Sequence, residues 1–180
     1  MHNLIPYKKS SDIIEIYNNT PIELLLEYHN LNKPFAKYSS AQILIGMCMD
    51  NRKKLNIPDN FAYILRTGGA NLRFSEFKIS YAIAIGGVKY IALIGHNNCG
   101  MVNLISKKEK FIDGLIHNAG WDKISAEEHF MQYAPMFEIE DEVNFLITEA
   151  KRLRIRYPKI TIAPLLYLIE ENKIYQIQEN

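Results

Sequence analysis

Three short apolar runs most constrain what this chain can fold into. They span residues 41–48 (AQILIGMC), 61–65 (FAYIL) and 89–95 (KYIALIG). Each is too short for a buried helix and lies between polar or glycine-rich segments, so each predicts a buried β-strand. A later run at 159–169 and the segment KIYQI at 173–177, separated by EEN, predict one more strand and its hairpin partner.

Helical patterns lie between and around these runs. We expect helix in the first 30 residues, with Thr20, Pro21 and Glu23 forming a capping box. Residues 75–85 predict a helix that two glycines stop, and SAEE at 125–128 predicts another capping box. Residues 138–157 form an amphipathic helix with an apolar face made of Val143, Leu146, Ile147, Ala150 and Leu153.

Strands that alternate with helices, and that are apolar on both faces, favour an α/β fold. The expected architecture is a mostly parallel central sheet flanked by helices, including N-terminal helices. A length of 180 residues fits one domain, spanning 1–180.

Composition excludes several classes of partner. The formal net charge is +1, from 21 basic and 20 acidic residues, so we expect binding to neither nucleic acid nor a membrane surface. We detect no apolar stretch long enough for a signal peptide or a membrane span. Two cysteines form no disulfide framework and are typical of a reducing compartment, so a cytoplasmic location is expected.

Chemistry-bearing side chains stand where two predicted strands end. Cys48 ends the first apolar run, His96 follows the third, and Cys99 comes three residues later. Because ligands of parallel sheets gather at the carboxyl ends of strands, these side chains meet if the two strands are neighbours. Two thiolates and one imidazole are a catalytic zinc ligand set with one open position. The alternative is a buried structural cysteine beside a capping histidine.

Four other histidines have no second ligand type nearby in the sequence. We interpret them as ordinary surface or core residues: His2, His29, His117 and His129.

The motifs C-M-D-N-R at 48–52, R-T-G-G-A at 66–70, Y-A at 81–82 and G-H-N-N-C-G at 95–100 resemble the β-class carbonic anhydrases, in particular the small microbial type. The resemblance is strong from about residue 42 to 102. It implies a zinc ion held by Cys48, His96 and Cys99, and a homodimer or higher homo-oligomer. It also implies reversible hydration of carbon dioxide to bicarbonate by a zinc-bound hydroxide. Two positions depart from the family pattern, Thr67 and Asn97.

Asp50 and Arg52 follow the first ligand at spacings of two and four residues. The resemblance implies that they form the catalytic dyad of the family. A carboxylate so close to zinc can orient the hydroxide, while a planar guanidinium holds both carboxylate oxygens away from the metal. The alternative is an ion pair that only closes the loop. Gly68 and Gly69 either border the substrate pocket or merely shape a turn.

Three rival functions remain open. Some relatives with the same metal motif hydrolyse carbon disulfide or carbonyl sulfide. A non-catalytic zinc-binding relative needs the ligands but neither Asp50 nor Arg52. A thiol-redox role for the two cysteines lacks a C-x-x-C motif.

Overall fold

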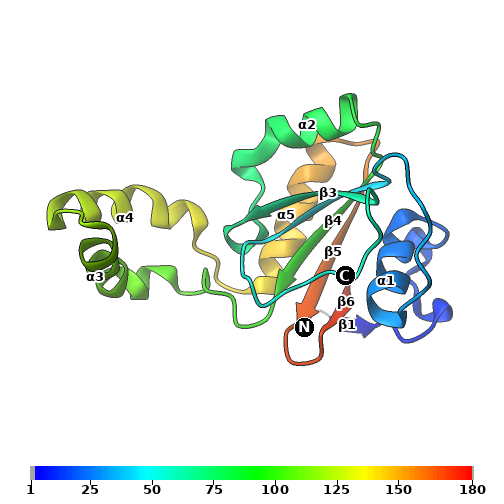
Figure 1. Ribbon diagram of the computed structural model, residues 1–180, viewed down its shortest axis with the longest axis horizontal. Helices are drawn as coiled ribbons and strands as arrows, with labels where there is room; N and C mark the ends of the chain where they lie inside the picture. Colours follow the sequence, from blue (N-terminus) through cyan, green and yellow to red (C-terminus); the bar gives the residue numbers. More distant parts are fainter. Residues whose placement is uncertain (1–2, 180) are drawn as a thin grey trace.

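The computed structural model describes residues 3–179 and has a six-stranded sheet at its centre (Figure 1). The strand order is β1-β6-β5-β4-β2-β3. Neighbours from β3 through β2 and β4 to β5 pair in parallel, whereas β6 and β1 add antiparallel strands. The bounds are Asn3–Pro6 (β1), Ile43–Cys48 (β2), Ala62–Thr67 (β3), Tyr90–His96 (β4), Thr161–Leu168 (β5) and Lys173–Gln178 (β6). The predicted mostly parallel α/β sheet is confirmed.

Helices cover both faces of the sheet. Helix α1 (Pro21–Leu31) packs on one face, and α2 (Glu76–Ala84) and α5 (Glu142–Arg156) pack on the other. Strand β2 serves both cores because its side chains alternate: Ile43, Ile45 and Met47 join the α1 core, and Leu44 joins the other. The five residues predicted for the apolar face of α5 all belong to that second core.

Two glycines bring the second layer close to strands β2 and β4. A Cβ on Gly46 of β2 would lie 2.6 Å from Leu72, and one on Gly95 of β4 would lie 2.7 Å from Leu146. Both distances are shorter than real Cβ contacts, so a side chain at either position would force the leucine to shift away from the sheet. Helix α5 thereby begins next to the end of β4.

Residues 3–20 differ from the prediction. Strand β1 and two short 3-10 turns, Ser10–Asp12 and Glu15–Tyr17, occupy the segment that was expected to be helical. The physical reason is tertiary: β1 pairs along β6, which gives its backbone groups partners that an isolated segment lacks. Thr20 does cap α1 by accepting a hydrogen bond from the main-chain nitrogen of Ile22, at 3.2 Å.

The reciprocal half of the predicted capping box is shifted by one residue. Glu23 accepts its hydrogen bond from the main-chain nitrogen of Asn19, at 2.7 Å, rather than from Thr20. The second predicted box, at Ser125, is wrong. Helix α4 (Lys123–Phe137) begins two residues earlier, where the Asp122 side chain accepts from the Ser125 nitrogen at 2.9 Å.

Helices α3 (Lys108–Ala119) and α4 form a hairpin that projects from the sheet as an arm (Figure 1). Gly120 closes α3 in a left-handed conformation, with φ of 72°. Among residues 3–179, no helix has the length and apolar character that crossing a membrane requires.

Candidate metal centre

The fold brings the three predicted ligands together. Strands β2 and β4 are parallel neighbours, so Cys48 and His96 reach the same edge of the sheet. Cys99 returns to them from the turn after β4, and the two sulfur atoms lie 3.9 Å apart. One ligand atom from each residue lies within 4.8 Å of the others, and all three residues are buried. A soft, tetrahedral cation such as zinc fits these three donors.

The His96 ring is oriented for metal binding. Its Nδ1 lies 2.8 Å from the main-chain oxygen of Asn97, which makes Nδ1 the protonated nitrogen because a carbonyl oxygen can only accept. The other ring nitrogen, Nε2, is fully buried and has no hydrogen-bond partner among the described residues. A lone pair left unpaired in this way is the expected state of a metal ligand.

The two thiols are electrostatically unequal. A hydrogen bond with the Cys99 thiol lowers the pKa of Cys48, and a contact with His96 lowers it further against the opposing effect of burial. The same sulfur contact and burial raise the pKa of Cys99. A bound cation would take the place of thiol protons here, because metal ligation requires the thiolate form.

Asp50 and Arg52 form a closely bonded pair beside these ligands. Arg52 Nη2 lies 2.6 Å from Asp50 Oδ2, and Arg52 Nε lies 3.0 and 3.1 Å from the two carboxylate oxygens. The guanidinium thus bonds to both oxygens and lowers the pKa of Asp50. Asp50 Oδ2 is also 3.8 Å from His96 Nε2, so the carboxylate faces the space that the ligands enclose.

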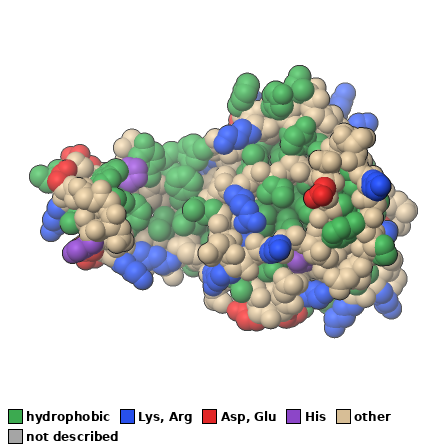
Figure 2. All heavy atoms as spheres, in the orientation of Figure 1, with side chains coloured by type: hydrophobic (Ala, Val, Ile, Leu, Met, Phe, Trp, Pro, Cys, Tyr) green, Lys and Arg blue, Asp and Glu red, His purple; other side chains and the backbone are tan. Residues whose placement is uncertain are grey.

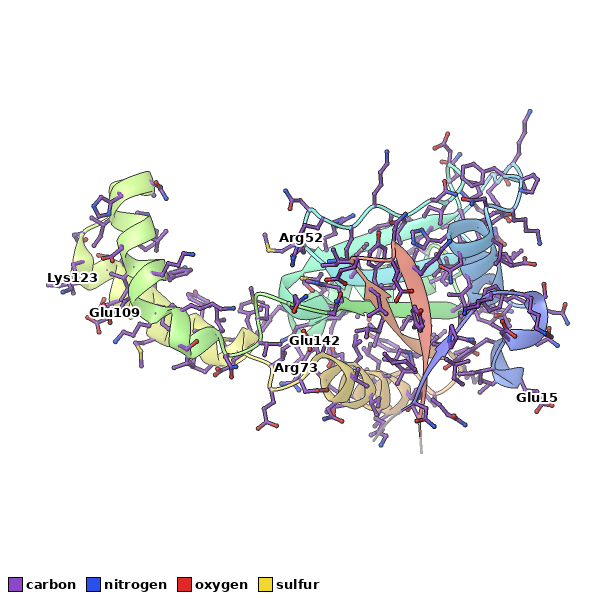
Figure 3. The ribbon with its side chains drawn as sticks, turned by 90° about the horizontal axis from the view of Figure 1, so that it is seen from below. Glu15, Arg52, Arg73, Glu109, Lys123 and Glu142 are labelled. Carbon is purple, nitrogen blue, oxygen red and sulfur yellow. The ribbon has the colours of Figure 1, made fainter. Side chains whose placement is uncertain are left out.

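Two carboxylates that the sequence did not single out hold the ligand loop. Glu142, the first residue of α5, accepts a hydrogen bond from the main-chain nitrogen of Cys99 at 3.0 Å. Glu170 accepts from the amide nitrogens of Asn97 and Asn98, at 2.7 and 3.3 Å. Figure 3 shows Arg52 and Glu142 at the end of the sheet from which the arm extends. No motif marks these glutamates, because their contacts span about 40 to 70 residues of sequence.

Asn97, one of the two departures from the family pattern, locks this loop to the β5–β6 hairpin. Its amide oxygen also accepts from the Ile169 nitrogen at 2.9 Å. Its amide thus bonds from both ends, accepting from Ile169 and donating to Glu170.

The glycines of the predicted pocket lie in the turn after β3. Gly69 has φ of +62°, which favours glycine. Gly68 borders an apolar cavity of about 610 Å³ between the arm and the sheet, with Met49, Thr67 and Met101 also in its lining. A Cβ on Gly68 would lie 3.1 Å from the Met101 sulfur. The backbone conformation of Gly69 therefore favours glycine at this position. Gly68 lines a cavity that also contacts Met101, two residues after Cys99.

Three of the other four histidines lie in the described part of the chain, away from these ligands, and His2 lies outside it. His29 is buried and accepts a hydrogen bond from the main-chain nitrogen of Asn56 at 3.1 Å. His117 bonds to its own helix, and His129 packs among aromatic rings of the arm. The interpretation of these three as surface or core residues agrees with their surroundings.

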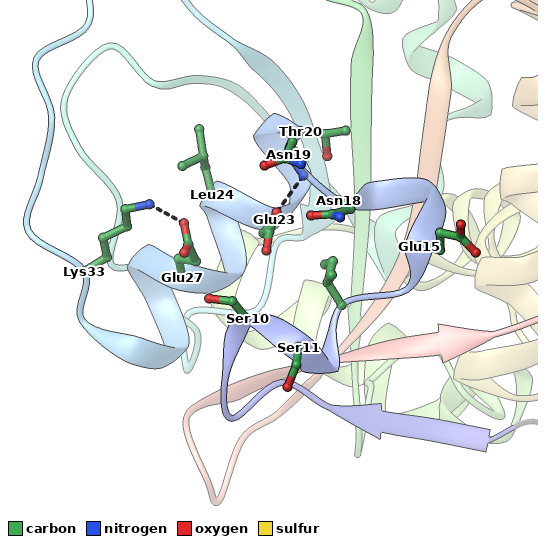
Figure 4. Close-up of a pocket in the computed structure, with 11 residues that line it drawn as sticks. Ser10, Ser11, Glu15, Asn18, Asn19, Thr20, Glu23, Leu24, Glu27 and Lys33 are labelled. Atoms are coloured by element: carbon green, nitrogen blue, oxygen red, sulfur yellow. Dashed lines mark hydrogen bonds and ion pairs between the residues drawn. The ribbon is translucent and has the colours of Figure 1, made fainter.

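A larger hollow, of about 640 Å³, lies far from this chemistry, beside α1 and the N-terminal turns (Figure 4). The acidic residues of α1 that line it already have partners: Glu23 bonds to the Asn19 nitrogen and Glu27 pairs with Lys33. The buried cysteine–histidine group is therefore the stronger candidate for function.

No protein-family model matches the chain, and neither does any curated protein sequence. Solved structures do. A carbonic anhydrase from Streptococcus mutans is 15% identical with a TM-score of 0.61, covering 92% of this chain and 100% of that one. A β-carbonic anhydrase from Trichomonas vaginalis is 20% identical with a TM-score of 0.61, covering 82% and 89%. A carbon disulfide hydrolase is 19% identical with a TM-score of 0.50, covering 89% and 90%. This chain therefore has the fold of the β-carbonic anhydrases.

Proposed function

We propose that the protein is a zinc-dependent carbonic anhydrase, a lyase that interconverts carbon dioxide and bicarbonate. The observation that carries the proposal is the placement of Asp50, held through both oxygens by Arg52, 3.8 Å from the unpaired nitrogen of His96. A scaffold that only binds metal has no need for an oriented carboxylate beside its ligands.

Cys48, His96 and Cys99 would hold the zinc ion and leave one position open. A zinc ion held by these three ligands would lower the pKa of a bound water from roughly 16 to 7, which would supply a nucleophile at neutral pH. The protein's own residues then decide how that nucleophile meets the substrate. Glu142 and Glu170 keep the Cys99 loop in place through main-chain and amide hydrogen bonds.

Asp50 is the acceptor that orients the nucleophile. Its carboxylate is ionised because the neighbouring guanidinium lowers its pKa. It can therefore accept a hydrogen bond from the nucleophile throughout the neutral pH range. Arg52 limits where that carboxylate can go. Arg52 Nη2 also donates to the main-chain oxygen of Asn98 at 3.0 Å, which ties the pair to the loop between His96 and Cys99.

A second candidate is hydrolysis of carbon disulfide or carbonyl sulfide. The fold is similar to that of a carbon disulfide hydrolase, and the cavity next to Gly68 is lined mainly by apolar side chains. Both substrates are small linear molecules with an electrophilic central carbon, like carbon dioxide, so the metal centre alone does not separate them.

We further propose that the chain works as a homodimer or larger homo-oligomer in the cytoplasm. Strand β3 is an edge strand, and Tyr63 and Ile64 on it are exposed beside Phe77 and Tyr81 of α2. Figure 2 shows hydrophobic side chains gathered over α2 and along the arm. Such surfaces typically mark contact with another protein chain. Two free, buried cysteines in the metal centre suit a compartment that keeps thiols reduced.

The test combines metal analysis with two assays on the same preparation. We expect about one zinc per chain, and carbon dioxide hydration that a chelator abolishes and added zinc restores. Carbon disulfide hydrolysis, followed by sulfide release, distinguishes the second candidate. Stoichiometric zinc without either activity would contradict the proposal.

A further inference from the structure

Within residues 3–179, three of the buried polar atoms that lack a partner belong to residues around the candidate metal centre, and the fourth belongs to His29 of α1. Among the described residues, four side chains have such an atom: His29, Lys53, Thr67 and His96. Native proteins pair nearly all buried polar groups, so each exception asks for an explanation. Thr67 and His96 end strands β3 and β4, and Lys53 lies in the loop that β2 leads into. Lys53 is the most costly of them, because the protonated form of a lysine side chain carries a full charge.

The burial of Lys53 is unusual for a lysine in a loop. Its residue is only 2% exposed, whereas the next residue, Lys54, is exposed. Lysine side chains normally extend their ammonium groups into water. Here the loop backbone is held from β3: Arg66 donates to the main-chain oxygens of Cys48, Asp50 and Lys53, each at 3.4 Å. This tether helps to fix the path of the loop from which Lys53 turns inward.

The charges around Lys53 come from the metal centre. Burial lowers the pKa of Lys53, while the negative charges of Cys48, Asp50 and Cys99 act in the opposite direction. Arg66 adds to the lowering. With zinc present, the two thiolates would balance the charge of the ion, and Asp50 is already balanced by Arg52. The ammonium of Lys53 would then be a buried charge without a paired carboxylate, next to the guanidinium of Arg66, which bonds only to main-chain oxygens among the described residues.

We propose that Lys53 supplies a fixed positive charge that stabilises a small monoanion, such as bicarbonate, at the open position of the metal centre. The inference rests on the proposed function. The physical reason is that two thiolates cancel the charge of the ion and weaken its attraction for an anion. A buried ammonium restores that attraction without occupying a coordination position, and it acts over a distance because the surroundings exclude water.

The experiment compares the parent protein with Lys53→Met, which keeps most of the side-chain volume and removes the charge. Lys54→Met is the matched control, because it makes the same charge change at an exposed neighbouring position. Each protein is loaded with cobalt, and visible absorption follows titration with azide, a monoanion, and separately with imidazole, a neutral ligand. Ionic strength is held constant, and thermal unfolding of each protein is recorded without metal.

We expect Lys53→Met to weaken azide binding by about tenfold or more, which corresponds to about 1.4 kcal/mol. Imidazole binding should change by less than about twofold, and Lys54→Met should match the parent for both ligands. Without metal, Lys53→Met should unfold at or above the parent temperature, because a buried unpaired charge has been removed.

Unchanged azide affinity in Lys53→Met would overturn the inference, as would an equal loss of azide and imidazole binding. If Lys53→Met does not fold, Lys53→Gln replaces it in the same titrations. Failure of both variants to fold would make Lys53 a structural residue and would also overturn the inference. A parent protein that binds no metal would instead refute the proposed function, and the inference with it.

Discussion

Replacing Asp50 with asparagine separates a catalytic role from a structural one. The change keeps the shape of the side chain and turns one acceptor oxygen into a donor amide. If the amide oxygen occupies the Oδ2 position, the NH2 group faces the Arg52 main-chain nitrogen and Nε, which lie 2.9 and 3.0 Å from Oδ1. In the other orientation, the NH2 group faces Arg52 Nη2 and takes the place of the acceptor nearest His96.

Either orientation loses at least one hydrogen bond that involves a charged group, which is worth about 1.5–3 kcal/mol. If the missing acceptor is the one that orients the nucleophile, that loss falls on the transition state. A tenfold change in rate corresponds to about 1.4 kcal/mol, so turnover should fall by a factor of order 10². Zinc content should not change, because the three ligands are intact.

The assay is stopped-flow carbon dioxide hydration, normalised to bound zinc, with thermal unfolding recorded in parallel. Asp59→Asn is the matched control, since Asp59 is exposed in the same connection between β2 and β3. A loop-closing ion pair predicts the reverse pattern: a lower melting temperature and nearly parental turnover per zinc. That pattern would refute the catalytic reading of Asp50.

Three further predictions concern the metal, the assembly and the response to acid. Cys99→Ala should contain much less zinc than the parent, as measured by elemental analysis. Full zinc content in this variant would show that Cys99 is not a ligand. In sedimentation, the parent should exceed the 20.9 kDa of one chain. Phe77→Asp, which places a charge at an 83% exposed position on α2, should shift the protein towards the monomer. A parent protein that is monomeric and fully active would contradict the proposed assembly. Burial lowers the pKa of His29 from 6.5 to about 4, so the folded state resists protonation that the unfolded chain accepts. The free energy of unfolding should therefore fall by about 3 kcal/mol between pH 6.5 and 4, as measured by urea unfolding. His29→Gln should remove most of this pH dependence. If the variant's unfolding free energy depends on pH as steeply as the parent's, His29 is not the responsible group.

Local patterns in the sequence determined the central part of this protein. Short apolar runs between polar segments predicted β2, β4 and β5, because a strand buried on both faces needs apolar side chains at every position. The run at 61–65 also gave a strand, β3, but the prediction that it is buried was wrong, because β3 lies at the edge of the sheet and exposes Tyr63 and Ile64. The same runs placed Cys48 and His96 at strand ends. Their meeting still depended on β2 and β4 being neighbours, which the sequence left as a condition and the sheet order fulfils.

Tertiary contacts decided what local patterns could not. Residues 3–6 form a strand because β6 offers them partners about 170 residues away. Glu142 reaches the Cys99 loop because Gly95 lets α5 pack against β4, and neither residue has a local signal for this contact. Lys53 and Lys54 are the same residue type at adjacent positions, yet one is buried and the other exposed. That difference arises from the path of the loop, which Arg66 holds from the neighbouring strand β3. Burial is the property on which the proposed role of Lys53 rests.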